Sequence, residues 1–139
     1  MWEYSIGLDW AGIIVERITG QSLGEYFKKH IFEPLDIDQQ GATMFPTGEA
    51  RKHLARMHQR NTDGKLVERE HINTAYTKDT QQLQDQHYQS GGAGLFAKPK
   101  EYVKILGAIL NEGTSAQTGA QILKKETVDL MWENQIPNQ

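Results

Sequence analysis

The residues of this chain that could take part in chemistry are few, and the first of them is a tyrosine. Tyr4 stands in the sequence Trp2-Glu3-Tyr4-Ser5, and a phenol can hold or release a proton when a suitable partner lies beside it. The nearest serine in the sequence, Ser5, points elsewhere on any regular backbone. Within this chain alone, a structural role for Tyr4 is therefore favoured over a role as general base.

A second candidate is the glycine-rich run from Gly91 to Gly94. It lacks the Gly-Lys-Ser/Thr that completes a phosphate-binding loop, and no strand–helix nucleotide unit surrounds it. Glycines allow a backbone to approach a bound molecule closely. A tight turn before the following helix explains the same residues equally well, so both interpretations stay open.

The histidines do not form a metal motif. No H-x-x-x-H or H-E-x-x-H pattern occurs and the chain has no cysteine, so we predict no metal site, no disulfide and no cofactor. His30 falls on the apolar face of a predicted helix, where we expect a buried and hydrogen-bonded side chain. The other histidines are scattered through polar sequence.

Two helices are predicted near the N-terminus to position these residues. Leu8–Ile18 is apolar around most of its circumference, with Asp9 and Glu16 as a narrow polar stripe. A helix of this kind is expected to be central and buried, and Gly20 suits its C-terminal cap. The second helix begins with a capping box at Ser22 and ends at Pro34.

The rest of the chain is predicted to hold a hairpin and two further helices. The runs Arg56–Gln59 and Lys65–Glu68 flank a turn that contains Asp-Gly, a strong hairpin signal. Pro99 opens a helix with a regular apolar face that ends at Gly113, and a last helix opens at Lys125 or Glu126. Residues 73–90 are interpreted as a loop. The fold class is therefore mainly α with one small β-hairpin, in a single domain that covers residues 1–139.

Length and charge exclude several classes of function. The chain has 139 residues, 37% hydrophobic and 24% charged, with a net charge of −3. This composition is typical of a globular domain, and no basic surface favours nucleic acid as a partner. No apolar run is long enough to span a membrane, and no signal peptide is evident. The absence of cysteine agrees with a cytoplasmic, reducing location.

Several stretches of the chain carry a resemblance when they are taken in order. They are Trp2–Ser5, Leu8–Gly12, Val15–Ser22, His30–Leu35, Gly91–Tyr102 and Glu126–Met131. Together they are similar to the helical part of the serine beta-lactamase-related proteins, which include class C beta-lactamases, penicillin-binding proteins, esterases and transesterases. The form of the first two stretches and of the hairpin is most similar to the fungal esterase and acyltransferase branch.

The resemblance implies a role for each candidate residue. In such enzymes the serine of an S-x-x-K motif is acylated, and a lysine and a tyrosine manage its proton. By resemblance, Tyr4 is that catalytic tyrosine. Trp10, Gly91, Gly92 and Gly94 are then the candidate substrate-binding residues, and they lie along a cleft for an ester, thioester or lactam.

The chain departs from the family in one decisive way. None of its lysines has a serine three positions earlier, so S-x-x-K is missing, and no K-T-G or H-x-G motif follows Trp132. Ile6 stands where many relatives carry asparagine. We therefore expect the helical lobe of a beta-lactamase/transpeptidase-like fold that lacks the sheet-bearing lobe, and that is inactive alone as a serine hydrolase.

Two alternatives and one consequence remain from the sequence. The chain could be a stand-alone module that binds a small molecule or a protein. It could also be an enzyme of a new kind that uses Tyr4, Asp9 or a histidine as acid or base. If the sheet-bearing lobe is missing, Trp2, Trp10, Leu95 and Phe96 are candidates for an uncovered apolar surface, which predicts a homodimer or another protein partner.

Overall fold

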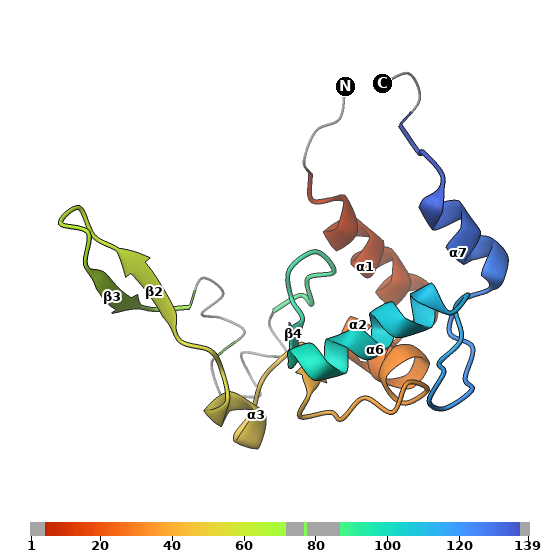
Figure 1. Cartoon of the computed structure of the whole chain (residues 1–139), viewed down its shortest axis with the longest axis horizontal. Helices are drawn as coiled ribbons and strands as arrows, with labels where there is room; N and C mark the ends of the chain where they lie inside the picture. Colours follow the sequence, from red (N-terminus) through yellow and green to blue (C-terminus); the bar gives the residue numbers. More distant parts are fainter. Residues whose placement is uncertain (1–4, 72–76, 78–86, 137–139) are drawn as a thin grey trace.

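The computed structural model describes residues 5–71, 77 and 87–136 of the chain. A helical part holds most of them, and a β-hairpin projects away from it (Figure 1). In chain order the described elements are α1 (Gly7–Thr19), α2 (Leu23–Phe27), η1 (Lys28–Phe32), β1 (Ala42–Thr43), α3 (Gly48–Lys52), β2 (Met57–Arg60), β3 (Leu66–Arg69), β4 (Phe96–Ala97), α6 (Pro99–Leu110) and α7 (Lys125–Trp132).

The two small sheets are both antiparallel pairs. Strands β2 and β3 form the projecting hairpin, with Met57 opposite Arg69 and Arg60 opposite Leu66. Strand β4 returns to pair with β1 and places Phe96 opposite Thr43. The predicted mainly α class with one hairpin is confirmed for the described residues, and β1–β4 is an additional short pair. No helix in the described part of the chain is long and apolar enough to cross a membrane.

Local signals in the sequence set several of the boundaries. Ser22 and Glu25 form the reciprocal capping box of α2, and Gly20 ends α1 with a left-handed backbone at φ 68°. Pro99 occupies the first turn of α6. In the hairpin, Gly64 has a φ of 82°, a backbone conformation in which glycine has no steric penalty. These predictions are confirmed.

The second predicted helix is not regular. After Phe27 the backbone widens into the π-helix η1, in which the N–H of Glu33 donates to the carbonyl of Lys28 at 2.9 Å. The expectation that His30 is buried is wrong, because His30 is exposed and its ring lies 4.4 Å from that of Tyr26. The wider turn changes which side chains face the core.

The core lies between η1, the segment that follows it, and α6. Leu35 is completely buried, and the segment continues inward with Ile37, Ala42 and Met44. Ala108 contributes from α6 and Phe32 from η1. Burial of these apolar side chains is the main favourable term in the folding of this part of the chain.

The expectation that the first helix is central and buried is wrong. In α1 only Gly12 is buried, while Ile14 is 54% exposed and Ile18 is more exposed still. Only one side of α1 is covered, since Gly12 and its neighbours contact Leu23 and Gly91. Periodicity identifies a helix that could be buried on all sides, but it does not provide the elements that would bury it.

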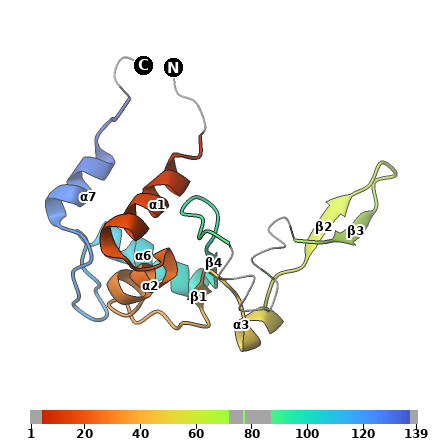
Figure 2. The same cartoon turned by 180° about the vertical axis from the view of Figure 1, so that it is seen from behind.

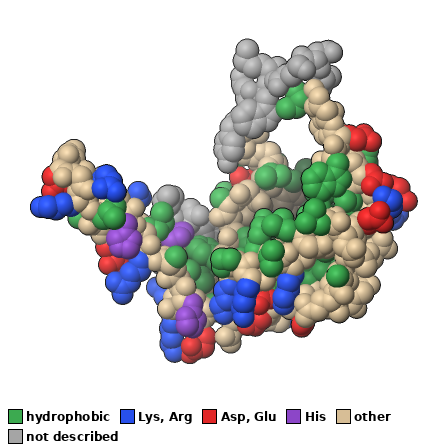
Figure 3. All heavy atoms as spheres, in the orientation of Figure 1, with side chains coloured by type: hydrophobic (Ala, Val, Ile, Leu, Met, Phe, Trp, Pro, Cys, Tyr) green, Lys and Arg blue, Asp and Glu red, His purple; other side chains and the backbone are tan. Residues whose placement is uncertain are grey.

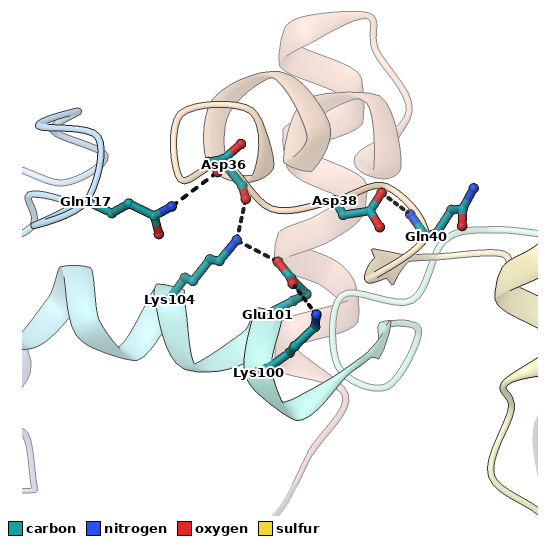
Figure 4. A network of polar contacts seen from close by, with 7 residues as sticks. All are labelled: Asp36, Asp38, Gln40, Lys100, Glu101, Lys104 and Gln117. Carbon is teal, nitrogen blue, oxygen red and sulfur yellow. Dashed lines mark hydrogen bonds and ion pairs between the residues drawn. The ribbon is translucent and has the colours of Figure 1, made fainter.

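A polar network fixes α6 against the segment after η1 (Figure 4). Lys104 Nζ lies 2.8 Å from Oε2 of the buried Glu101 and also donates to the carbonyl of Asp36. Gln117 Nε2 donates to the Asp36 carboxylate at 3.2 Å. The network joins three segments that are distant in the sequence, and it places the start of α6, which follows the glycine loop, against the core.

Candidate functional site

The structure brings the glycine-rich run to the first turn of α1, beside Asp9 and Ser90. The hydroxyl of Ser90 donates to Oδ1 of Asp9, and the N–H of Gly92 donates to the same oxygen at 3.3 Å. The N–H of Ala93 donates to Ser90 Oγ at 2.9 Å, and that of Gly94 donates to the Ser90 carbonyl at 3.0 Å. Three consecutive amides of the loop are therefore bound by Asp9 or Ser90.

Glycine is needed in this loop because other atoms approach it closely. A Cβ on Gly91 would lie 2.3 Å from the carbonyl oxygen of Leu8, and one on Gly94 would lie 2.6 Å from the Ser90 carbonyl oxygen. A Cβ on Gly92 would lie 3.2 Å from Oδ2 of Asp9. None of these three glycines has a positive φ. The close contacts are with the chain itself, in particular with the first turn of α1.

The candidate residues from the sequence are distributed as follows. Gly91, Gly92 and Gly94 lie together in the loop against α1, and Gly94 is buried. Trp10 is in the same helix turn as Asp9 and is 59% exposed. Tyr4 lies outside the described residues. Asp9 appeared in the sequence as part of a polar stripe, and no local signal indicates its partner Ser90, which is 81 positions away.

An open apolar groove of about 730 Å³ lies beside the loop. The glycine loop forms one side of the groove, and helical residues that include Leu8, Ile31 and Ile105 form the others. Hydrophobic side chains gather on this part of the molecule (Figure 3). The groove therefore presents an uncovered apolar surface directly beside the candidate loop.

The apolar surface also extends along three helices. Large apolar side chains are exposed on α1, on α6 and on α7, and these helices lie in the same part of the molecule in both views (Figures 1 and 2). The exposed side chains are Leu8, Trp10, Ile14, Ile18, Tyr102, Val103, Leu106, Leu110, Leu130, Met131 and Trp132. We call this set the apolar helix face. Exposed apolar side chains that lie next to one another mark interaction surfaces, so the neighbouring members of this set are candidates for one.

The serines of the chain are all described, and each one makes a local backbone contact. Ser5 Oγ accepts from the N–H of Gly7 at 3.2 Å, and Ser22 Oγ caps α2. Ser115 Oγ accepts from the N–H of Thr118 at 3.1 Å, and Ser90 is held as described above. None of the four stands in an S-x-x-K sequence. The described residues also contain no group of three metal-ligating side chains.

One carboxyl group near a second, more polar hollow has a shifted pKa. The hydrogen bonds from Ser22, first that of its backbone N–H and then that of its hydroxyl, lower the pKa of Glu25. Glu25 lines a hollow of about 550 Å³ together with Lys28 and Gln89. Because the carboxylate of Glu25 is engaged in the capping box, its role there is to stabilise α2.

Comparison with known proteins identifies the family whose sequence pattern the chain matches. The family model described as Beta-lactamase matches residues 1–138. Among curated proteins, the chain is 30% identical over 132 residues to the ML-236A carboxylate methylbutanoyltransferase of Penicillium citrinum, covering 95% of this chain and 28% of that protein.

Two further relatives carry esterase names. A lovastatin esterase of Penicillium rubens is 30% identical, over 97% of this chain and 31% of its own length. An esterase of Burkholderia gladioli is 27% identical, over 98% of this chain and 36% of its own length. The chain therefore spans about a third or less of the length of these relatives, and it matches the fungal esterases and acyltransferases that the sequence resembles.

Proposed function

Because the chain belongs to the beta-lactamase family, we propose that it forms the helical side of a cleft for acyl transfer or ester hydrolysis. Tyr4 is the proton-handling residue in this proposal. Trp10, Gly91, Gly92 and Gly94 contact the substrate. The observation that carries the proposal is the placement of the glycine loop against the first turn of α1, which begins three residues after Tyr4.

The proposed substrate class is an ester, a thioester or a lactam. The relatives are named as a methylbutanoyltransferase and as esterases, and both reactions attack a carbonyl carbon that bears a leaving group. A neutral substrate of this kind fits the surroundings of the loop, where the groove beside it is largely apolar. The described residues that line this groove include no charged side chain.

We further propose that residues 1–139 have no serine hydrolase activity by themselves. An unaided hydroxyl holds its proton too tightly to be a nucleophile near neutral pH, so a serine needs an adjacent base. No serine of the chain has a lysine three positions later, and all four are engaged in contacts with the backbone or with Asp9. The nucleophile would have to come from a polypeptide that completes the cleft.

The proposal also includes a partner for the apolar helix face, apart from Leu8 and Trp10, which belong to the proposed cleft. Leaving side chains such as Trp132 and Leu110 in water forgoes the free energy of burial, roughly 25 cal/mol for each Å² of apolar area. A second copy of this chain is the simplest partner, since one self-complementary patch is sufficient for a symmetric dimer. The rest of a family member's fold could cover the same face. Light scattering across a dilution series tests the dimer, and a monomeric mass at high concentration would exclude it.

Three measurements test the catalytic part of the proposal. The chain alone should give no labelling by a fluorophosphonate probe and no hydrolysis of a chromogenic short-chain ester. Residues 1–138 should then replace the matching segment of the Penicillium citrinum relative and retain acyl transfer. The matched control carries Tyr4→Phe in the same chimaera and should lose activity. Stoichiometric labelling of the isolated chain, or full activity of the Tyr4→Phe chimaera, would contradict the proposal.

A second candidate function is a binding module without catalysis. The groove of about 730 Å³ favours it, because an apolar hollow of this size can bind a small molecule without any nucleophile. Binding of a hydrophobic ligand by the isolated monomer, combined with an inactive chimaera, would support this alternative over the first.

A further inference from the structure

The contact between Asp9 and Ser90 connects two parts of the chain that the proposed cleft requires to be in register. Asp9 belongs to the first turn of α1, five positions after Tyr4, and Ser90 immediately precedes the glycine loop. The two residues are 81 positions apart, and Ser90 is only 6% exposed. A contact of this kind between distant segments fixes their relative position.

We propose that Asp9 and Ser90 are positioning residues that hold the Gly91–Gly94 loop in place before any substrate binds. The assignment of the loop to a substrate cleft rests on the proposed function, but the hydrogen bonds that hold the loop do not depend on it. Oδ1 of Asp9 accepts hydrogen bonds from the Ser90 hydroxyl and from the Gly92 N–H, and Ser90 Oγ in turn accepts one from the Ala93 N–H. A hydrogen bond to a charged acceptor is roughly twice as strong as a neutral one, so Asp9 is the main anchor.

The same geometry argues against a reactive serine at this position. Ser90 Oγ already donates to Asp9 and accepts from the N–H of Ala93, and the side chain is buried. Neither of these two hydrogen-bond partners of the Ser90 side chain is a lysine or a histidine, and an adjacent base is what activates a serine. The pair therefore orders the backbone rather than forming an acyl-enzyme.

Close packing makes the position of the loop sensitive to this pair. The carbonyl oxygen of Leu8, the neighbour of Asp9, lies 2.3 Å from where a Cβ of Gly91 would be, and Gly12 lies against the backbone of Gly91 on the next turn of α1. The loop has no room to move toward the helix. Hydrogen bonds to Asp9 and Ser90 hold the loop on the side of α1, ahead of the hydrogen-bonded strand that begins at Phe96.

The test is amide exchange of the individual loop residues in the whole chain, followed by NMR. In Asp9→Leu and Ser90→Ala, the exchange rates of the Gly92 and Ala93 amides should rise about fivefold or more, as expected for loss of a hydrogen bond of ordinary strength. Gly94 is an internal reference in Ser90→Ala, since its amide binds the backbone carbonyl of Ser90. Its rate should rise less.

Two matched variants separate positioning from general destabilisation. Glu16→Ala removes another carboxylate of α1 that accepts a backbone N–H, that of Leu23 at 2.8 Å, and it should leave the Gly92 and Ala93 rates unchanged. Asp9→Asn keeps an acceptor oxygen and should restore most of the protection. Equal loop exchange in the wild type, Asp9→Leu and Ser90→Ala would overturn the inference, as would an equal increase in Glu16→Ala. Because no substrate is used, failure here is distinct from failure of the proposed chemistry.

Discussion

Lys104 Nζ lies 2.8 Å from Oε2 of Glu101, one turn earlier in α6, and the Glu101 side chain is only 8% exposed. Glu101 Oε2 is fully buried and forms the ion pair with Lys104. The geometry of this contact is not that of a directed hydrogen bond. Removal of either partner should therefore have unequal effects. Lys104→Met leaves a buried carboxylate without this partner and should cost about 2–3 kcal/mol of unfolding free energy.

The matched variant Glu101→Gln should cost less, about 1 kcal/mol, because the remaining ammonium of Lys104 is partly exposed and still donates to the Asp36 carbonyl. Urea denaturation of both variants measures the difference. A Glu101→Gln variant that is less stable than Lys104→Met would show that the carboxylate, and not its partner, is the stronger requirement.

The same pair predicts a dependence of stability on pH. The contact with Lys104 lowers the pKa of Glu101 below its ordinary value of 4.5, against the opposing effect of burial. A carboxyl group with a lowered folded-state pKa contributes stability that is fully present above the unfolded pKa and is lost as the pH falls through the folded pKa. The free energy of unfolding should thus decrease on acidification below about pH 4.5. Glu101→Gln should make this decrease smaller, and parallel curves for both proteins would contradict the assignment.

Gly113 should tolerate no side chain. Its φ is 86°, and a Cβ would lie 2.1 Å from the carbonyl oxygen of Leu123. Gly113→Ala combines a left-handed backbone with a backbone clash and should cost about 3 kcal/mol or more. The control is Gly107→Ala, in the exposed middle of α6 with no atom within 4 Å of the new Cβ. It should stabilise the chain by about 0.5–1 kcal/mol, and thermal melting compares the two.

The position of α1 predicts that its apolar residues matter little to the isolated chain. Ile14→Asp changes a side chain that is 54% exposed, so the unfolding free energy should change by about 1 kcal/mol or less. Leu35→Ala, at a completely buried position, should cost about 2–5 kcal/mol. If the monomeric Ile14→Asp variant fails to fold, Ile14 must be buried in the folded chain and α1 would belong to the core.

The parts of the fold that could be predicted from the sequence are those with local causes. The capping box at Ser22, the left-handed Gly20, the first-turn Pro99 and the Asp-Gly hairpin each depend on residues that are at most a few positions apart. The burial of α1 could not be predicted, because it depends on what packs against the helix. The expectation for His30 is wrong because the π turn shifts the core-facing side of the helix by one residue.

The candidate site was predictable only in part for the same reason. The glycine run was visible as a feature, but its contact with Leu8 and its hydrogen bonds to Asp9 depend on segments more than 80 positions apart. Glu101 and Lys104 are charged residues that no local sequence pattern places in the interior, although Glu101 is buried against Gly41. Nothing in a single sequence reports such a long-range pairing.

The π turn of η1 has a consequence for the alignment of this sequence with those of its relatives. In that turn the N–H of Glu33 reaches back five residues to Lys28, where an α-helix reaches back four. An α-helix that gains one residue, while the residues on either side keep their places, acquires a turn of this kind. A single-codon insertion would therefore produce it. Family members whose helix is regular here should then align with a one-residue gap between Lys28 and Phe32, while Phe27 and Leu35 stay in register on either side.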